Sequence, residues 1–413
     1  MKKFLFCLFF LFYSLHLESR HITLGTCKVS ENAKKYVNDV LNNNRLSYGP
    51  YLKRFERDFA RLHGVAVGLM SNSGTSSLHV ALQALKICEG WNDGDEVIVP
   101  AVTFVATANI VLHNGMKPVF VDVDKDYYEI NPLLIEAKIT PKTRAIIPVH
   151  LFGQPCDMDP ICALAKKYNL KIIEDSCETM FAHYKGKPVG SMGDIGCFST
   201  YVAHLLTTGV GGLSITNNSK YAICMRSLLN HGRDSIYISI DDDKNILQTH
   251  KEEIVSRRFK FLNVGHSFRL TELEGALGVA QLEEWEYIIN RRRKNAQYLI
   301  DKLRNLEDVL QLPKIRAGNE HSFMMFPVVL KGCDKREAVN FLEEHGIETR
   351  DMLPLVNQPV YLRLFGLKAS DYPVADWINN NGFYIGCHQE LSQGDLDYIV
   401  KNLHCCFDRS CKF

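Results

Sequence analysis

The chain has 413 residues and a formal net charge of +1, with 46% hydrophobic and 23% charged residues. This is an ordinary globular composition, long enough for one large domain and a smaller one. The balanced charge gives no electrostatic basis for binding nucleic acid or an anionic membrane.

The chain begins with a hydrophobic extension. Two lysines precede an almost wholly apolar run over residues 4–17, which is the form of a secretory signal. The run is short for a membrane-spanning helix, and no small-x-small cleavage sequence follows it. A start codon upstream of the true one is the alternative. The thirteen scattered cysteines favour that alternative and a reducing cytoplasm, although secretion or membrane tethering stays open.

Short β-branched runs alternate with helical stretches between residues 65 and 250. The pattern predicts strands at 96–99, 118–122, 145–149 and 170–174, and helices at 76–86, 107–114, 133–138 and 158–168. Strands that alternate with helices indicate a mostly parallel sheet covered on both faces.

The remainder of the chain predicts a helical connection and a second, smaller unit. A long helical region runs from residue 269 to about 305, and its basic run 291–294 is interpreted as a solvated helix face. A strand at 324–329 and a helix at 335–346 then indicate a small C-terminal domain. Cys405 and Cys406 with Cys411 lack the second half of a zinc site, so no metal is predicted.

Three segments carry polar or aromatic residues at the ends of predicted elements. Gly74 and Thr75 open a helix, where free backbone N–H groups bind anions, although hydroxyl residues there are more often plain caps. Asp175 ends an apolar strand, where a carboxylate can hold a pyridine nitrogen protonated or simply cap a loop. Phe104 follows another strand and could stack on a flat ring or belong to the core.

Together with Gly193-Asp-Ile-Gly-Cys-Phe-Ser199, these segments closely resemble the DegT/DnrJ/EryC1/StrS family. Segments 49–56 and 150–153 are similar too, and the resemblance runs from about residue 44 to 398. Its members are fold-type I pyridoxal phosphate enzymes that mostly aminate nucleotide-linked keto-sugars. The resemblance implies an α/β fold in which a large domain, with a mostly parallel seven-stranded sheet flanked by helices, is joined to a smaller C-terminal α/β domain. The implied division is an extension over 1–21, a cofactor-binding domain over 22–260, a helical dimer-contact region over 261–310 and a small domain over 311–413.

The resemblance also implies roles for individual residues. Gly74, Thr75 and Ser199 would hold the cofactor phosphate. Phe104 would stack on the ring, Asp175 would pair with its nitrogen, and Glu178 would lie near its hydroxyl. Ser267, in a Gly-x-Ser-x-Arg segment that usually carries Asn, would reach the cofactor of a neighbouring subunit, which implies a homodimer with shared active sites. Arg269 and, more weakly, Arg350 would bind substrate.

His204 stands where the family has its Schiff-base lysine, counted from Phe198-Ser199 and from Gly211-Gly212. An imidazole cannot form the imine, but it can move protons near neutral pH. Within the family this replacement characterises keto-deoxysugar 3-dehydratases, and segments 174–178 and 384–389 are similar to those of such an enzyme. The resemblance therefore implies noncovalent pyridoxal or pyridoxamine phosphate.

The leading hypothesis is removal of the C3 oxygen from a nucleotide-linked 4-keto-6-deoxy sugar in cell-surface polysaccharide or deoxysugar biosynthesis, with His204 as the base and glutamate as the amino donor. The first alternative is a sugar-nucleotide aminotransferase of the same family. The second is a catalytically inactive, cofactor-binding regulatory homologue, which is suggested by Ser267 and by Val210 in place of a usual glutamate.

Two further points concern the subtype and the substrate. An iron–sulfur 3-dehydratase needs clustered thiolates, but Cys224, Cys333 and Cys387 stand far apart in the sequence. The nucleotide and the sugar stereochemistry stay open, with Arg350, Asn357 and residues 241–243 as loose candidates for recognition.

Overall fold

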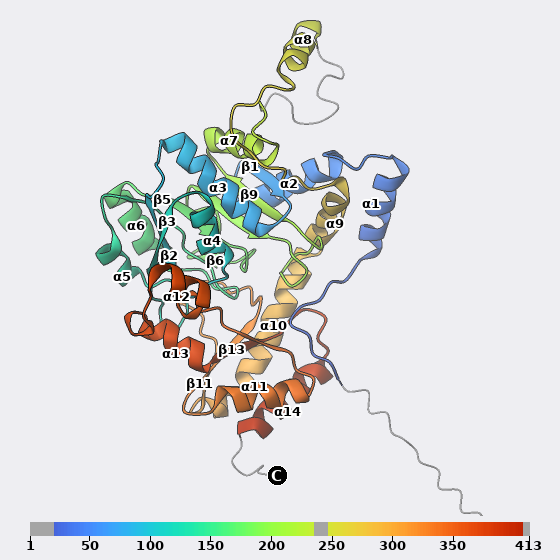
Figure 1. The fold of residues 1–413 in the computed structure, drawn as a ribbon. Helices are drawn as coiled ribbons and strands as arrows, with labels where there is room; N and C mark the ends of the chain where they lie inside the picture. Colours follow the sequence, from blue (N-terminus) through green and yellow to red (C-terminus); the bar gives the residue numbers. More distant parts are fainter. Residues whose placement is uncertain (1–19, 235–246, 408–413) are drawn as a thin grey trace, which may run out of the picture.

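The computed structural model describes residues 20–234 and 247–407, and its centre is a seven-stranded sheet (Figure 1). The strand order is β1-β9-β8-β5-β4-β2-β3. Only β9 runs against the other strands, because it pairs antiparallel with both β1 and β8. The prediction of a mostly parallel sheet is confirmed. The strands are β1 (Val67–Ser71), β2 (Glu96–Pro100), β3 (Lys117–Val121), β4 (Thr143–Ile146), β5 (Lys171–Asp175), β8 (Ile195–Ser199) and β9 (Gly212–Thr216).

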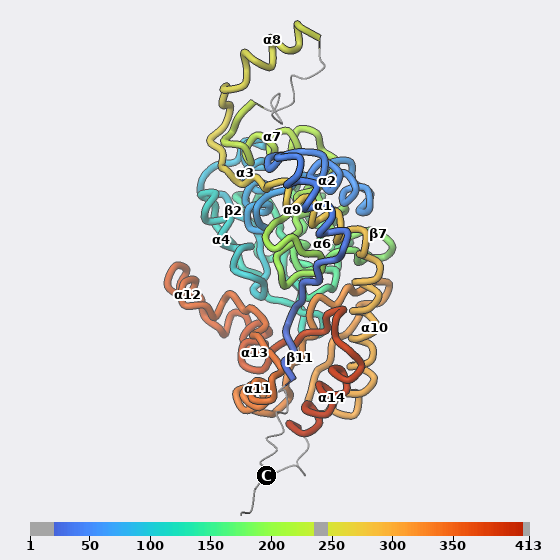
Figure 2. The backbone as a smooth tube through the Cα atoms, turned by 90° about the vertical axis from the view of Figure 1, so that its right-hand side faces the viewer, coloured from blue at the N-terminus to red at the C-terminus, as the bar shows by residue number. Residues whose placement is uncertain are grey.

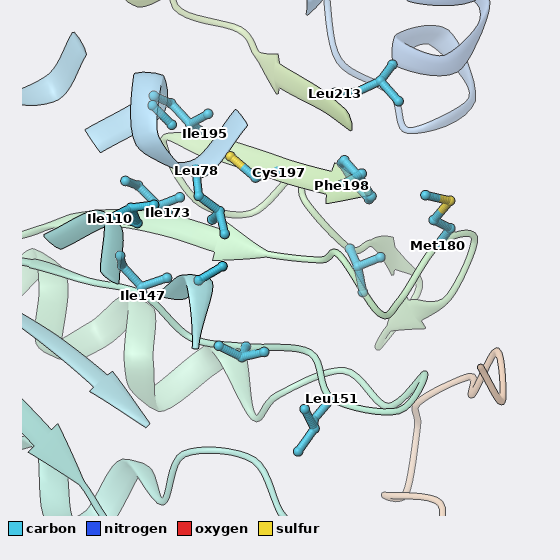
Figure 3. Packing of buried hydrophobic residues seen from close by; sticks show 14 of the residues in the cluster. Leu78, Ile110, Ile147, Leu151, Ile173, Met180, Ile195, Cys197, Phe198 and Leu213 are labelled. Atoms are coloured by element: carbon cyan, nitrogen blue, oxygen red, sulfur yellow. The ribbon is translucent and has the colours of Figure 1, made fainter. Parts of the chain in front are cut away.

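Helices bury the sheet on both faces, as expected for β-branched strands that lack a polar side. Along β2, Val97 and Val99 enter one hydrophobic cluster, and the intervening Ile98 enters another. Figure 3 shows Leu78 and Ile110 from two of the covering helices beside the strand residues of the first cluster. The helices connected with this sheet are α3 (Gly74–Glu89), α4 (Ala106–His113), α5 (Pro132–Ile135), α6 (Met158–Tyr168) and α7 (Ser219–Leu229).

A smaller antiparallel sheet lies below the first in Figure 1, with the order β10-β11-β13-β12. Its strands are β10 (Leu310–Gln311), β11 (Phe326–Leu330), β12 (Thr349–Asp351) and β13 (Gly382–Ile385). Its hydrophobic cluster takes side chains from α10 (Trp285–Leu303), α11 (Lys335–Glu344) and α14 (Gln393–Phe407). The strand and helix predicted for this region are both present, each within two residues of its expected bounds.

The remaining helices and short strands surround these two sheets. They are α1 (Glu31–Asn42), α2 (Pro50–Leu62), β6 (His183–Tyr184), β7 (Lys187–Pro188), α8 (Gln248–Arg257), α9 (Glu272–Glu283), α12 (Pro359–Phe365) and α13 (Pro373–Asn381). Helix α8 projects from the body of the molecule in Figures 1 and 2.

The predicted helical region is present as two helices, α9 and α10, which meet at Glu284. One prediction about this region is wrong. Its basic run is not a solvated face, since Arg292 is fully buried. The guanidinium of Arg292 donates from Nη1 to the Met324 carbonyl at 2.8 Å and from Nε to Gln389 Oε1 at 3.1 Å. It therefore ties α10 to the segments before β11 and after β13 of the smaller sheet, and sequence charge alone could not reveal those acceptors.

Among residues 20–234 and 247–407, no helix is long and apolar enough to cross a membrane. The same residues contain no group of three His, Cys, Asp or Glu side chains placed to hold a metal ion. The signal-like run, residues 241–243 and Cys411 lie outside the described residues.

The core generates an expectation for acid stability. His63 is buried against Phe59, Phe181 and Phe198, and this burial lowers its pKa to about 4. In the unfolded chain, His63 takes up a proton near pH 6.5. The free energy of unfolding therefore keeps its full value above that pH and falls as the pH drops toward 4. Between pH 7 and pH 5, His63 alone lowers the free energy of unfolding by about 2 kcal/mol. Replacing His63 with Gln should reduce that pH dependence, measured by urea unfolding.

The exposed His250 offers a matched control. Its replacement by Gln should leave the pH dependence of unfolding unchanged. An equal pH dependence in wild type and His63→Gln would contradict the account.

Candidate functional site

A cavity of about 820 Å³ opens where β5 and β8 end and α3 begins, and its walls come from both sheets. The carboxyl ends of parallel strands are the usual place for ligands in open α/β sheets. Seven residues singled out from the sequence as site positions line it together with Arg350 and Val210. They are Gly74, Thr75, Phe104, Asp175, Glu178, Ser199 and His204.

The start of α3 forms one wall. Ser73 caps the helix by accepting a hydrogen bond from the Ser76 N–H at 3.0 Å, and the N–H groups of Gly74 and Thr75 have no acceptor within the helix. A Cβ on Gly74 would lie 2.7 Å from the Ser199 Cβ and 2.8 Å from the Cys177 Sγ. Glycine is therefore required for this close packing, and the result is a cradle for an anion.

Asp175 is buried at the end of β5. It accepts hydrogen bonds from Thr107 Oγ1 at 2.8 Å and from the Cys177 N–H at 3.2 Å. Burial raises the pKa of Asp175 above its ordinary value, although the hydrogen bonds from these two donors lower it. A buried carboxylate with only neutral donors favours a cation beside it. The ring of Phe104 also lines the cavity and is 54% exposed, so it is not a core residue.

Glu178 is a second buried acid in the cavity. Its Oε2 accepts a hydrogen bond from the Phe152 N–H at 3.0 Å. Burial raises the pKa of Glu178 to about 7, and the charge of Asp175 adds to this rise, while the Phe152 hydrogen bond opposes it. Glu178 can therefore donate or accept a proton near neutral pH.

His204 lies on the turn between β8 and β9, here called the His204 turn (residues 200–211). The turn is closed by Thr208 N–H donating to the Thr200 carbonyl at 2.9 Å and by a contact of 2.6 Å between their hydroxyls. His204 Nδ1 lies 3.3 Å from the Ser199 carbonyl, so Nδ1 carries the proton and Nε2 is the basic nitrogen. Burial lowers the pKa of His204 to about 4, and its ring is neutral at pH 7. No lysine lines the cavity within the described part of the chain.

Three sequence candidates lie outside this cavity. Ser267 and Arg269 are exposed and contact each other, with Arg269 Nη2 donating to Ser267 Oγ at 3.0 Å. Arg269 also lies 3.3 Å from His231. Asn357 donates to Asp376 at 2.9 Å and does not line the cavity.

Sequence reasoning missed most of the opposite wall. These residues come from the N-terminus and from the small domain, and no local pattern marks them because long-range packing brings them to the cavity. They include Leu24, Gly25, Met324, Met325, Glu348, Asp351, Leu353 and Tyr384. Of these, Tyr384 belongs to the segment that is similar to a 3-dehydratase, and Met324 and Met325 lie in the strand predicted over 324–329, but the sequence assigned none of the three to the site.

Comparison with known proteins identifies the family of the chain. The model of the DegT/DnrJ/EryC1/StrS aminotransferase family matches residues 28–404. The chain belongs to this family. A GDP-perosamine synthase from Caulobacter vibrioides is 33% identical, over 92% of this chain and 97% of that protein. A UDP-N-acetyl-3-dehydro-alpha-D-glucosamine 3-aminotransferase from Acidithiobacillus ferrooxidans is 38% identical, over 88% and 90%.

The fold comparison gives a similar result. The E. coli GDP-4-keto-6-deoxy-D-mannose-3-dehydratase, solved with bound hydrated PLP, has a TM-score of 0.83 and 26% identity, over 93% of this chain and 99% of that chain. The predicted fold class, that of the fold-type I pyridoxal phosphate enzymes, is confirmed. Proteins similar to this chain thus include both an aminotransferase and a dehydratase.

The geometry of His204 gives a testable expectation about its protonation. ¹⁵N NMR of histidine-labelled protein should show a neutral ring protonated at Nδ1 at pH 7, which titrates near pH 4 because burial disfavours the charged form. The His204→Asn variant identifies the signal. A ring protonated at Nε2, or one that titrates near 6.5, would contradict the described geometry.

Proposed function

We propose that the chain is a pyridoxamine phosphate-dependent enzyme that removes the C3 oxygen of a nucleotide-linked 4-keto-6-deoxy sugar. The observation that carries this proposal is His204 in the cavity, at the position of the family's lysine, with no described lysine beside it. The family membership and the nucleotide-sugar names of its relatives support the substrate class.

The residues of the cavity fit the cofactor. The N–H groups of Gly74 and Thr75, with the Ser199 hydroxyl, would hold its phosphate. Asp175 would hold the pyridine nitrogen protonated, and that nitrogen would supply the positive partner that the buried carboxylate lacks. Phe104 would stack on the ring, and Glu178 would face the ring hydroxyl. When bound, the cofactor supplies an amine that condenses with the sugar ketone and a ring that accepts electrons.

His204 would then move the protons. With Nδ1 directed at the Ser199 carbonyl, Nε2 would accept a proton from carbon and return it to the departing C3 hydroxyl. Negative charge brought into the cavity by a phosphate would raise the low pKa of His204 toward neutrality, where a base works best. Hydrolysis would release a 3-deoxy-4-keto sugar and ammonia, and the proposed amino donor, glutamate, would replace the amine and the two electrons used to reduce C3.

Amino transfer is the second candidate. The family description and the 38% identical relative favour it, because both carry the name aminotransferase. This reaction would require His204 to carry protons without the imine that a lysine forms. The third candidate, an inactive cofactor-binding protein, is favoured by exposed Val210 in the cavity wall and by Ser267 in the Gly-x-Ser-x-Arg segment.

Substitutions at His204 separate these candidates. His204→Asn should retain cofactor binding but lose turnover by about 10²–10⁴-fold, the usual contribution of a positioned base. His204→Lys should gain a cofactor that borohydride fixes covalently, detected by its mass after digestion. Wild type, treated in parallel, should not be labelled.

Each result that contradicts these expectations leads to a different conclusion. Near-normal turnover in His204→Asn would remove the dehydratase proposal. Borohydride labelling of wild type would identify an imine-forming lysine and favour amino transfer. Cofactor binding with no turnover on any keto-sugar would support the inactive alternative.

We further propose a cytoplasmic homodimer in which Ser267 and Arg269 complete the neighbouring site, with glutamate as the amino donor. In mixed dimers of His204→Asn and Arg269→Ala, one of the two sites then has both residues intact. Mixing the two weakly active variants should restore about half of the wild-type activity per mixed dimer. Restoration should fail for His204→Asn mixed with itself, and failure of the mixture would contradict shared sites.

A further inference from the structure

The first described residues connect the small domain with the His204 turn. Residues 20–25, here called the strap, run beside the small sheet before the chain rises to α1 (Figures 1 and 2). The Ile22 N–H donates to the Gly346 carbonyl at 2.7 Å, and the Ile22 carbonyl accepts from the Glu348 N–H at 2.9 Å. The Ile22 side chain is buried in the cluster of the small domain. The strap is therefore fixed to the small domain like an added strand.

Glycines of the small domain leave room for the strap. A Cβ on Gly386 would lie 2.2 Å from the Thr23 carbonyl oxygen, and one on Gly346 would lie 2.1 Å from that of Arg20. The Thr23 hydroxyl lies 3.3 Å from His388 Nε2. Gly386 and His388 belong to segment 384–389, which has no role in the proposed chemistry. Holding the strap accounts for both residues.

The inner end of the strap reaches the cavity. A Cβ on Gly25 would lie only 2.9 Å from the Cα of Ala203, the residue before His204. Leu24 and Gly25 line the cavity, and the Leu24 N–H donates to Glu348 Oε2 at 3.1 Å on the same wall. Tyr201 and Val202, on the same turn, are exposed and also line the cavity. The strap thus forms the backing of the turn that carries His204.

We propose that the strap is a positioning element that holds His204 at the place in the cavity from which it can transfer protons. The inference rests on the proposed role of His204 as the base. Proton transfer requires hydrogen-bond distance, and a displacement of about 1 Å can cost about 10²-fold in rate. Because the strap is anchored to the small domain, it also fixes the His204 turn relative to Glu348, which precedes β12, and to Arg350 on β12.

The test uses Gly25→Ala in the full chain. Gly25 has no positive φ, so alanine suits its backbone, but the added Cβ must displace Ala203. We expect kcat to fall about 10- to 100-fold with cofactor Kd unchanged, and the ¹⁵N NMR pKa of His204 to shift. The matched control is Val29→Ala, which changes an exposed side chain of the same N-terminal segment beyond the strap. This control should behave as wild type.

Thr23→Val is the second variant if Gly25→Ala does not fold. It removes the hydroxyl contact with His388 and the hydrogen bond to the Gly25 carbonyl at 2.9 Å, and it keeps the branched shape of the side chain. It should show a smaller loss of kcat in the same direction. Wild-type kcat and an unshifted His204 pKa in the folded strap variants would overturn the proposal. If His204→Asn keeps turnover, the proposed function fails, but the shift of the His204 pKa still reports whether the strap positions the turn.

Discussion

The site depends on the close approach of two backbone segments. A Cβ on Gly212 would lie 2.4 Å from the Ser73 carbonyl oxygen and 2.6 Å from the Gly74 N–H nitrogen. Only a glycine at the start of β9 lets this strand pass so near the start of α3. The antiparallel insertion of β9 between β1 and β8 thus brings the His204 turn beside the anion cradle. The cradle and the proposed base are placed by one contact.

Much of the cavity follows from local sequence because its residues lie at the ends of consecutive elements of one sheet. Gly74 at a helix start and Asp175 at a strand end could be located by pattern, and their common cavity follows from parallel topology. Their roles still rest on resemblance. His204 could be singled out only because the residues on both sides of it keep the expected spacing.

The rest could not be predicted because it depends on contacts between distant segments. The burial of Arg292 requires carbonyl acceptors from the small domain that no charge pattern reveals. The packing of Leu24 and Gly25 into the cavity depends on Gly346 and Gly386, more than 300 residues away in the chain. A charged run and an N-terminal segment look alike in sequence whether they are solvated or buried.

The central claim is that the reaction breaks the bond between C3 and its oxygen. The most direct measurement uses 4-keto-6-deoxy nucleotide sugars labelled with ¹⁸O at C3, with GDP, CDP, UDP and dTDP forms incubated with the protein, pyridoxal phosphate and glutamate. Mass spectrometry then follows the label. The account predicts a 3-deoxy-4-keto product that has lost ¹⁸O. A C4-amino product that retains the label would contradict it and establish amino transfer instead.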